Sequence, residues 1–293
     1  DRFYIPGWLP QNQSGPETFF YNLRQMGFKL SLWLCQDYDL LWEEERQAGE
    51  YAKKFNKEYS YEGASILDPH FACPNYMDGL TKRDEAWFEH LKKFVQQGVQ
   101  CFKLDGCNQV GEHPKRAWAN GKTDEEDHNL YPLVYGKQMA RGFEDFTGKR
   151  PMVYSSGGYA GLQQFVATWA GDTGGGPRSC ASLLNLGMSG HSNTSCDMGI
   201  YDSKSLHFGM LQTWSQQNNW CYWNQPWHQR KAALDGFRKY VKLRYRLMPY
   251  LYTAAAEASR TGWPAMRSLP FAYPDVPAYD ACETTYMLGD NLL

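Results

Sequence analysis

The sequence predicts an α/β barrel, because short apolar runs that could form buried strands alternate with longer amphipathic stretches. The chain has 293 residues, of which 42% are hydrophobic, and this is enough for one sizeable core. Chains of about 200 to 250 residues often form a single barrel of this kind. We therefore expect one large domain in which parallel strands are joined by crossover helices.

The first half of the chain contains three predicted pairs of a helix followed by a strand. The helices are expected at 15–27, 84–98 and 130–146, and the strands at 28–34, 99–104 and 151–155. In the second helix Leu91, Phe94 and Val95 recur at helical spacing, and Gly98 stands where a carboxyl-terminal cap belongs. Residues 45–80 form the longest irregular stretch, and a loop of that length in a compact domain is usually functional.

The second half continues the alternation less regularly. After a short helical turn, the predicted elements are a strand at 167–171, a helix at 180–188, a strand-like run at 191–197, a segment of ambiguous period at 206–214 and a long last helix. The last helix has apolar side chains on one face from Leu234 to Met248 and should end at Gly262. Pro249 should kink this helix, because proline removes a backbone donor.

The composition changes at residue 264, after which Pro, Asp and Tyr are frequent and no helical period is visible. Such a segment is typical of the first strands of a β-domain. The expected domains are therefore a partial barrel at 1–263 and the beginning of a carboxyl-terminal β-sandwich domain at 264–293.

Charge and hydropathy exclude two classes of partner. The net charge is −2 and the basic residues are scattered, so the field that attracts phosphate backbones is absent. No run of about 18 apolar residues occurs, as a membrane-spanning helix would require. We expect neither a nucleic-acid partner nor a membrane partner.

The cysteines and histidines do not form a recognisable metal motif. The eight cysteines contain no C-x-x-C pair, and the seven histidines lie mostly outside the motifs described below. A metal-dependent hydrolase on a barrel would need clustered His and Asp at strand ends. We expect free thiols, no metal and no cofactor.

Asp105 ends one predicted strand and is followed by a glycine-containing loop. Because strand side chains alternate, Lys103 and Asp105 should point into the barrel mouth, while Phe102 and Leu104 face the helices. A carboxylate at this end of a strand lies where barrel enzymes perform catalysis, and Lys103 would keep it ionised, as a nucleophile must be. The alternative is a buried Lys/Asp pair that is only structural.

A second carboxylate, Asp172, follows another predicted strand and precedes a glycine-rich turn. Trp169 would supply an apolar wall that favours the protonated acid, which suits a proton donor. The turn could instead bind phosphate, but no G-K-S/T follows it and the aspartate would repel a phosphate. One ionised and one protonated carboxyl in one barrel mouth are the minimal machinery for glycoside cleavage.

Six segments resemble glycoside hydrolase family 31, a family of retaining α-glycosidases built on a (β/α)8 barrel. They are GFKLSLWL at 27–34, FKLD at 102–105, WAGD at 169–172, LNLGMSGHSNTSCD at 184–197, PYLYTAAAEASRTG at 249–262 and YMLGDNLL at 286–293. KLDGCN also resembles the nucleophile strand of related α-galactosidase families. Since family members begin with a β-sandwich and two barrel strands before the position of Asp1, the resemblance implies a barrel that lacks its first two strands.

The resemblance implies a role for each matching residue. It makes Asp105 the nucleophile and Asp172 the general acid/base, and it places Asp197 in the sugar pocket. It also places Trp33 and Asp37 near that pocket. The implied partner is a carbohydrate, an oligosaccharide or glycan with a terminal α-linked sugar.

Three positions depart from the family pattern. Many α-glucosidase and α-xylosidase members have Arg where this chain has Ser156, and Arg and His where it has Gln216 and Asn218. A site that lacks these contacts to sugar hydroxyls should prefer another sugar, so we expect an α-galactoside or α-N-acetylgalactosaminide substrate. Two alternatives are an α-glucosidase or α-xylosidase in which other residues supply the contacts, and an inactive carbohydrate-binding barrel.

Overall fold

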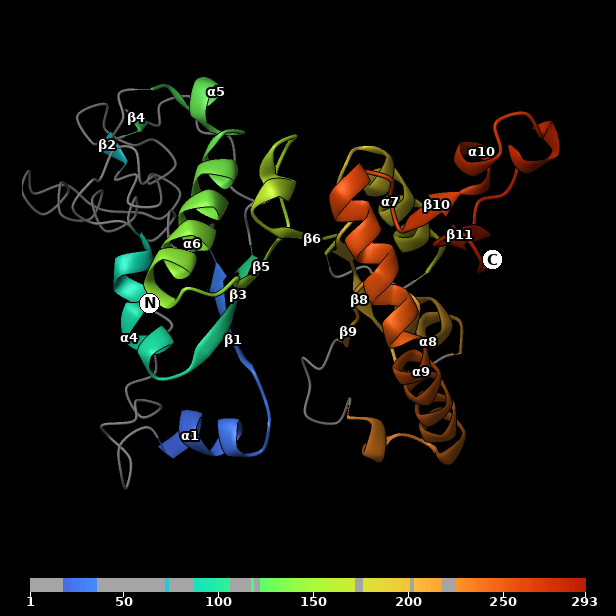
Figure 1. Ribbon diagram of the computed structural model, residues 1–293, viewed down its shortest axis with the longest axis horizontal. Helices are drawn as coiled ribbons and strands as arrows, with labels where there is room; N and C mark the ends of the chain where they lie inside the picture. The colour runs from blue at the N-terminus through green and yellow to red at the C-terminus, as the bar shows by residue number, and fades with distance from the viewer. Residues whose placement is uncertain are drawn as a thin grey trace, which may run out of the picture. The chain divides into compact units, whose positions relative to one another are not determined.

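The computed structural model describes residues 18–35, 72–73, 87–105, 117–118, 122–171, 176–200, 203–217 and 225–293 (Figure 1). These residues divide into two compact units, one within 1–166 and the other within 167–293. Each unit has its own buried core of apolar side chains. The predicted loop at 45–80 lies outside the described residues except for Ala72–Cys73.

The first unit contains the three predicted helix and strand pairs. Its strands are β1 (Leu30–Cys35), β2 (Ala72–Cys73), β3 (Val99–Asp105), β4 (Ala117–Trp118) and β5 (Met152–Ser155). Its helices are α1 (Thr18–Gln25), α4 (Trp87–Gln96), α5 (Asp124–Asp127), α6 (Tyr131–Thr147) and the 3-10 helix η3 (Leu162–Gln164). The predictions for this half of the chain are confirmed within a few residues at each boundary.

Strands β1, β3 and β5 are parallel and pair in that order. In the register Cys35 is opposite Asp105, and Leu104 is opposite Ser155, so the three strands end at one edge. Phe102 and Leu104 are completely buried, whereas Lys103 and Asp105 are half-buried. This alternation confirms that Asp105 lies on the opposite face of β3 from the helix-packed core.

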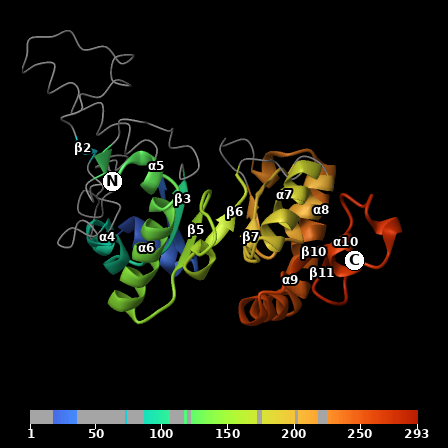
Figure 2. The ribbon, with the colours of Figure 1, turned by 90° about the horizontal axis from the view of Figure 1, so that it is seen from above.

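Helix α6 covers one face of these strands, as Figures 1 and 2 show. Tyr131, Tyr135, Met139 and Phe143 recur every four residues on its buried side. The Phe143 ring meets the Phe102 ring edge to face, with centroids 6.5 Å apart. Burial of each such side chain contributes about 1.5 to 3 kcal/mol, so this contact fixes α6 on the sheet and orients β3.

The second unit contains six short strands and six helical segments in its described residues. The strands are β6 (Ala167–Trp169), β7 (Thr194–Ser195), β8 (Asp197–Met198), β9 (Gln216–Gln217), β10 (Met266–Ser268) and β11 (Tyr286–Leu288). The helices are α7 (Pro177–Met188), α8 (Ser203–Met210), α9 (Lys231–Thr261), α10 (Leu269–Ala272) and the 3-10 helices η5 (Pro226–His228) and η6 (Pro277–Tyr279). The ambiguous segment at 206–214 is thus mainly helical.

Pairing in the second unit is parallel near the predicted site and antiparallel near the end of the chain. Strand β6 pairs with β7 and β8 pairs with β9 in parallel, whereas β10 and β11 are antiparallel. The strand-like run predicted at 191–197 therefore forms two very short strands rather than one. Helix α9, the long orange helix in Figure 1, packs against α8 and ends at Gly262 as predicted.

Helix α9 includes Pro249 and continues for twelve residues beyond it, to Thr261. Proline has no N–H, so the carbonyl of Tyr245 loses its intrahelical donor. The Tyr245 side chain is 75% exposed, so water can reach this part of the helix surface. The helix therefore tolerates the proline, and the predicted kink stays a prediction.

Gly209 allows α8 to lie directly on β8. A Cβ atom at this position would meet the Cβ of Met198 and would lie 2.9 Å from its Cγ. We expect Gly209→Ala to destabilise the protein by about 1 to 3 kcal/mol, because overpacking here exceeds the helix propensity that alanine gains. Thermal unfolding of the intact protein measures this.

Gly236 is the matched control, since it lies inside α9 and its added Cβ would meet only Leu206 Cδ1 at 3.7 Å. Gly236→Ala should leave the midpoint of unfolding unchanged or raise it. Equal midpoints for the two variants would contradict the close approach of α8 to Met198.

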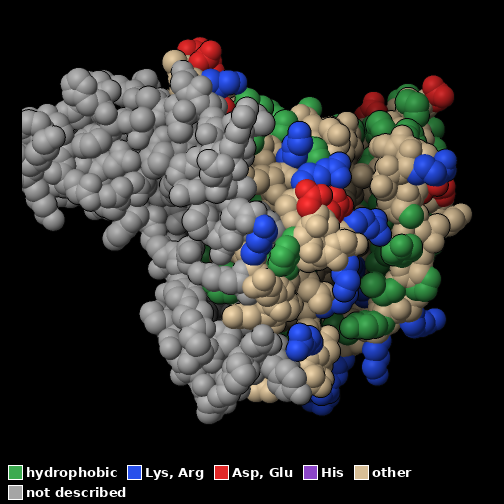
Figure 3. All heavy atoms as spheres, turned by 60° about the vertical axis from the view of Figure 1, so that its left-hand side comes forward, with side chains coloured by type: hydrophobic (Ala, Val, Ile, Leu, Met, Phe, Trp, Pro, Cys, Tyr) green, Lys and Arg blue, Asp and Glu red, His purple; other side chains and the backbone are tan. Residues whose placement is uncertain are grey.

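One face of the described residues carries interspersed charges. On the face drawn in Figure 3, Lys and Arg side chains stand singly among polar and apolar ones and form no continuous basic field. Within the described ranges, no helix combines the length and apolar character needed to cross a bilayer.

Candidate active site

Asp105 is the last residue of β3 and receives a hydrogen bond from the neighbouring strand. The indole Nε1 of Trp33, in β1, donates to Asp105 Oδ2 over 2.7 Å. The β1 and β3 register brings the two residues together, because Trp33 is opposite Lys103 and Cys35 is opposite Asp105. An indole N–H is a donor only, and it complements the negative charge of a carboxylate.

Two further predicted residues lie at the same edge of this sheet. Lys103 is on the same face of β3 as Asp105 and is half-buried. Ser156 follows β5, and its backbone N–H donates to Leu104 O over 3.2 Å. The Ser156 hydroxyl is buried and has no hydrogen-bond partner among the residues that the structure describes. The first unit thus brings Trp33, Lys103, Asp105 and Ser156 to the carboxyl ends of three adjacent strands.

The second unit brings two other predicted residues to Asp197, which is completely buried. Trp169 Nε1 donates to Asp197 Oδ1 over 2.8 Å, and Gln216 Nε2 donates to the same oxygen. Asp197 and Gln216 are opposite each other in the β8 and β9 register. Trp169 was expected to line a wall beside Asp172, and the structure adds that its polar edge is bound to Asp197.

Residues outside the motifs hold the segment that precedes Asp197. Gln212 is completely buried and contacts Ser195 and Cys196, and Arg244 of α9 donates to the carbonyls of Met210 and Gln212. The sequence analysis missed both residues. Neither belongs to a periodic pattern or a motif, so only the tertiary contacts reveal them.

A buried histidine lies beside β6. His191 Nδ1 and Thr168 Oγ1 are 2.8 Å apart, and both residues are buried. Burial lowers the pKa of His191, because the charged imidazolium would lose its hydration. This contact joins β6 to the segment after α7, and Thr168 directly precedes Trp169 in β6.

Three predicted site residues, Asp37, Asp172 and Asn218, lie outside the described residues. Their roles stay predictions. Among the residues that the structure describes, no group of three or more His, Cys, Asp or Glu side chains could hold a metal ion.

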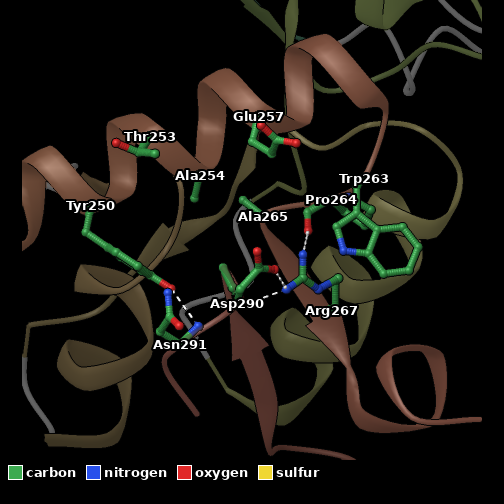
Figure 4. Close-up of a pocket in the computed structure, with 11 residues that line it drawn as sticks. Tyr250, Thr253, Ala254, Glu257, Trp263, Pro264, Ala265, Arg267, Asp290 and Asn291 are labelled. Carbon is green, nitrogen blue, oxygen red and sulfur yellow. Dashed lines mark hydrogen bonds and ion pairs between the residues drawn. The ribbon is translucent and has the colours of Figure 1, made fainter.

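A cavity of about 170 Å³ in the second unit lies between the carboxyl-terminal half of α9 and the turn after β11 (Figure 4). None of the predicted site residues lines it. The Tyr250 hydroxyl accepts from the backbone N–H of Asn291 over 3.1 Å, and buried Arg267 pairs with Asp290 over 2.6 Å. These contacts tie the last strands to α9, and we assign the cavity no catalytic role.

Parallel strands that are joined by helices and end in polar and acidic residues define an α/β domain with a candidate site at the carboxyl ends of its strands. The model of the glycosyl hydrolases family 31 TIM-barrel domain matches residues 7–254. The chain therefore belongs to family 31 of the glycosyl hydrolases, and the predicted family and barrel class are confirmed.

Two relatives and one solved structure illustrate the similarity. The chain is 33% identical to alpha-glucosidase 2 of Bacillus thermoamyloliquefaciens over 59% of this chain and 23% of that protein. It is 24% identical to an alpha-xylosidase of Emericella nidulans over 94% of this chain and 37% of that protein. The fold matches a family 31 dextranase of Flavobacterium johnsoniae, solved with glucose, with a TM-score of 0.70 and 22% identity over 96% of this chain and 38% of that one.

These relatives bear on the expected sugar. Their names refer to glucosides, xylosides and dextran, and none of the three refers to a galactoside. The chain spans 23% and 37% of the length of the two curated relatives.

Proposed function

We propose that the intact protein is a retaining α-glycoside hydrolase in which Asp105 is the nucleophile and Asp172 is the general acid/base. Membership of family 31 carries this proposal. The position of Asp105 at the carboxyl end of β3, with its carboxylate bound by Trp33, supports it further.

In the first step the Asp105 carboxylate attacks the anomeric carbon and forms a glycosyl ester. Asp172 gives its proton to the glycosidic oxygen, so the leaving group departs as an alcohol. The Trp33 N–H donates to Asp105 Oδ2 and so helps to orient the carboxylate for the attack.

In the second step Asp172, now a carboxylate, removes a proton from water as the water attacks the anomeric carbon. The ester bond breaks, Asp105 becomes a carboxylate again, and the sugar leaves with its original anomeric configuration. Each carboxyl group returns to its starting protonation state, so the cycle balances without a metal or cofactor.

The remaining predicted residues are assigned to sugar binding. We place Asp197, Trp169 and Gln216 in one group, because the Trp169 and Gln216 side chains both donate to the Asp197 carboxylate. Lys103 and Ser156 accompany Asp105 at the edge of the first unit, and we retain Asp37 and Asn218 in the site by family resemblance.

We also propose that residues 264–293 begin a second domain, which the antiparallel pairing of β10 and β11 supports.

The proposed substrate is a terminal α-glucoside or α-xyloside, which the names of the relatives support. The neutral residues Ser156 and Gln216 favour the competing galactoside reading, because they stand where cations were expected. However, Gln216 donates a hydrogen bond to Asp197, so a neutral side chain can supply part of the hydrogen bonding that an arginine would supply. The departures therefore allow a gluco-configured sugar.

Hydrolysis of a panel of aryl α-glycosides by the intact protein tests this choice. We expect kcat/KM for the glucoside or xyloside to exceed that for the galactoside and the N-acetylgalactosaminide by about a hundredfold. Each buried polar group left unpaired by the wrong sugar costs about 1 to 3 kcal/mol, and at least two would be affected. Preference for a galactoside contradicts the substrate, and turnover of no glycoside contradicts the hydrolase.

A further inference from the structure

We propose that Gln212, anchored by Arg244, is a positioning residue that holds Asp197 in the sugar pocket. The inference rests on the proposed function, since it concerns the site in which Asp197 acts. Neither residue belongs to the motifs from which the site was predicted. Gln212 contacts the two residues that precede Asp197, and Arg244 binds the turn that carries Gln212.

The first step is the contact between Gln212 and the segment before Asp197. Gln212 Oε1 accepts from Ser195 Oγ and from the backbone N–H of Cys196, both over 3.1 Å. Gln212 Nε2 donates to Cys196 Sγ over 3.0 Å. A backbone N–H can only donate, so the amide oxygen must face Cys196 and the orientation of the amide is determined.

Complete burial makes the loss of these hydrogen bonds costly in free energy. Gln212, Ser195 and Cys196 are each fully buried. Without the Gln212 carbonyl, the Cys196 N–H and the Ser195 hydroxyl would each lose an acceptor in a place that water does not reach. The residue that follows these two is Asp197, so their displacement would move its carboxylate.

The second step is the anchor from α9. Arg244 Nη1 donates to Met210 O and Gln212 O, both over 2.8 Å, and Nη2 donates to Thr213 O over 3.3 Å. Met210 is the last residue of α8, where carbonyls lack helical partners and favour a cation. One guanidinium therefore fixes the turn that carries Gln212.

The third step links the turn to the site. Gln216 follows Gln212 by four residues and donates to Asp197 Oδ1 from the opposite strand. The turn thus holds Asp197 twice, through its preceding backbone and through its carboxylate. A misplacement of about 1 Å in a binding group can cost about a hundredfold in rate, so small movements of this turn should affect catalysis.

The test compares Gln212→Met, Asp197→Asn and the double variant in the intact protein, at a temperature where circular dichroism shows each to be folded. We expect Gln212→Met to lower kcat/KM about tenfold to a hundredfold. The loss should appear in whichever of kcat and KM the Asp197→Asn variant changes. The double variant should be no worse than Asp197→Asn within about twofold, because Gln212 acts through Asp197. Losses that multiply in the double variant would overturn the inference.

Arginine variants on α9 provide a milder series and a control. Arg244→Met should reduce kcat/KM as Gln212→Met does, and Arg244→Lys should recover part of the loss, since an ammonium can still donate to these carbonyls. Arg246→Met, two residues away on the exposed side of α9, should match the wild type. Equal effects of Arg244→Met and Arg246→Met would overturn the anchoring role.

A crystal structure of Gln212→Met gives a readout that does not depend on turnover. We expect the Asp197 carboxylate to move so that its 2.8 Å contact with Trp169 Nε1 lengthens beyond hydrogen-bonding distance. An unchanged contact overturns the inference even if the protein hydrolyses glycosides. Conversely, displacement of Asp197 in a protein without glycosidase activity supports the positioning role and contradicts only the proposed function.

Discussion

Replacement of Asp105 by Asn is expected to lower kcat at least about a thousandfold for every glycoside that the intact protein cleaves. The amide retains the size of the carboxylate and can accept from Trp33, but it cannot form the glycosyl ester. Steady-state kinetics with an aryl α-glycoside and with a natural disaccharide measure the loss. Because the first step is blocked, the loss should not depend on the leaving group.

The control is Asp145→Asn, which removes a carboxylate from the exposed side of α6. Its kcat should equal that of the wild type. A loss of less than about tenfold in Asp105→Asn would show that another residue is the nucleophile.

Replacement of Asp172 by Ala is expected to spare substrates with good leaving groups. A nitrophenolate departs without much protonation, so kcat/KM for such an aryl glycoside should fall far less than the roughly 100- to 10,000-fold loss expected for an alkyl glycoside or disaccharide. Added azide should restore turnover of the aryl substrate and give a glycosyl azide of retained configuration, because it attacks the ester on Asp105 without general-base help.

The slope of log(kcat/KM) against leaving-group pKa is the decisive comparison for Asp172. It should be steeper for the Asp172→Ala variant than for the wild type, and Asp145→Ala should leave it unchanged. Equal losses across all leaving groups would assign Asp172 a role other than proton transfer.

Local patterns in the sequence predicted the elements that rely on strong periodicity. The apolar repeat of Leu91, Phe94 and Val95 predicted helix α4. The alternation in β3 placed Phe102 and Leu104 toward the helices and Asp105 on the other face, as the structure has them. The segment at 206–214 remained ambiguous, because a run that packs on several sides has neither helical nor strand period.

The contacts that organise the candidate site could not be predicted in the same way. Trp33 and Asp105 are 72 residues apart, and Trp169 and Asp197 are 28 apart, so strand register decides both hydrogen bonds. Asp105 and Trp169 were predicted from their positions near strand ends, and Trp33 and Asp197 from the family resemblance, but neither source indicates that each tryptophan donates to its aspartate. Gln212 had no signal at all, because a buried glutamine is recognisable only by its partners.

The expected sugar shows the limit of reasoning from missing residues. The absence of cations at Ser156, Gln216 and Asn218 predicted an α-galactoside or α-N-acetylgalactosaminide, but it did not reveal which groups replace them. The structure shows Gln216 donating to Asp197, and the named relatives act on gluco-configured or xylo-configured sugars by their names. A departure from a family pattern therefore identifies a position of interest, whereas the chemistry depends on the contacts made there.

Covalent trapping of the intermediate tests the central claim most directly. A fluorinated α-glycosyl fluoride slows both steps through its electron-withdrawing fluorine, while the fluoride leaving group keeps the first step the faster one, so the ester accumulates. After proteolysis, mass spectrometry should find one glycosyl unit on the peptide that contains Asp105, and the Asp105→Asn variant should remain unlabelled. A label on another residue, or inversion of the anomeric configuration without any label, would contradict the account.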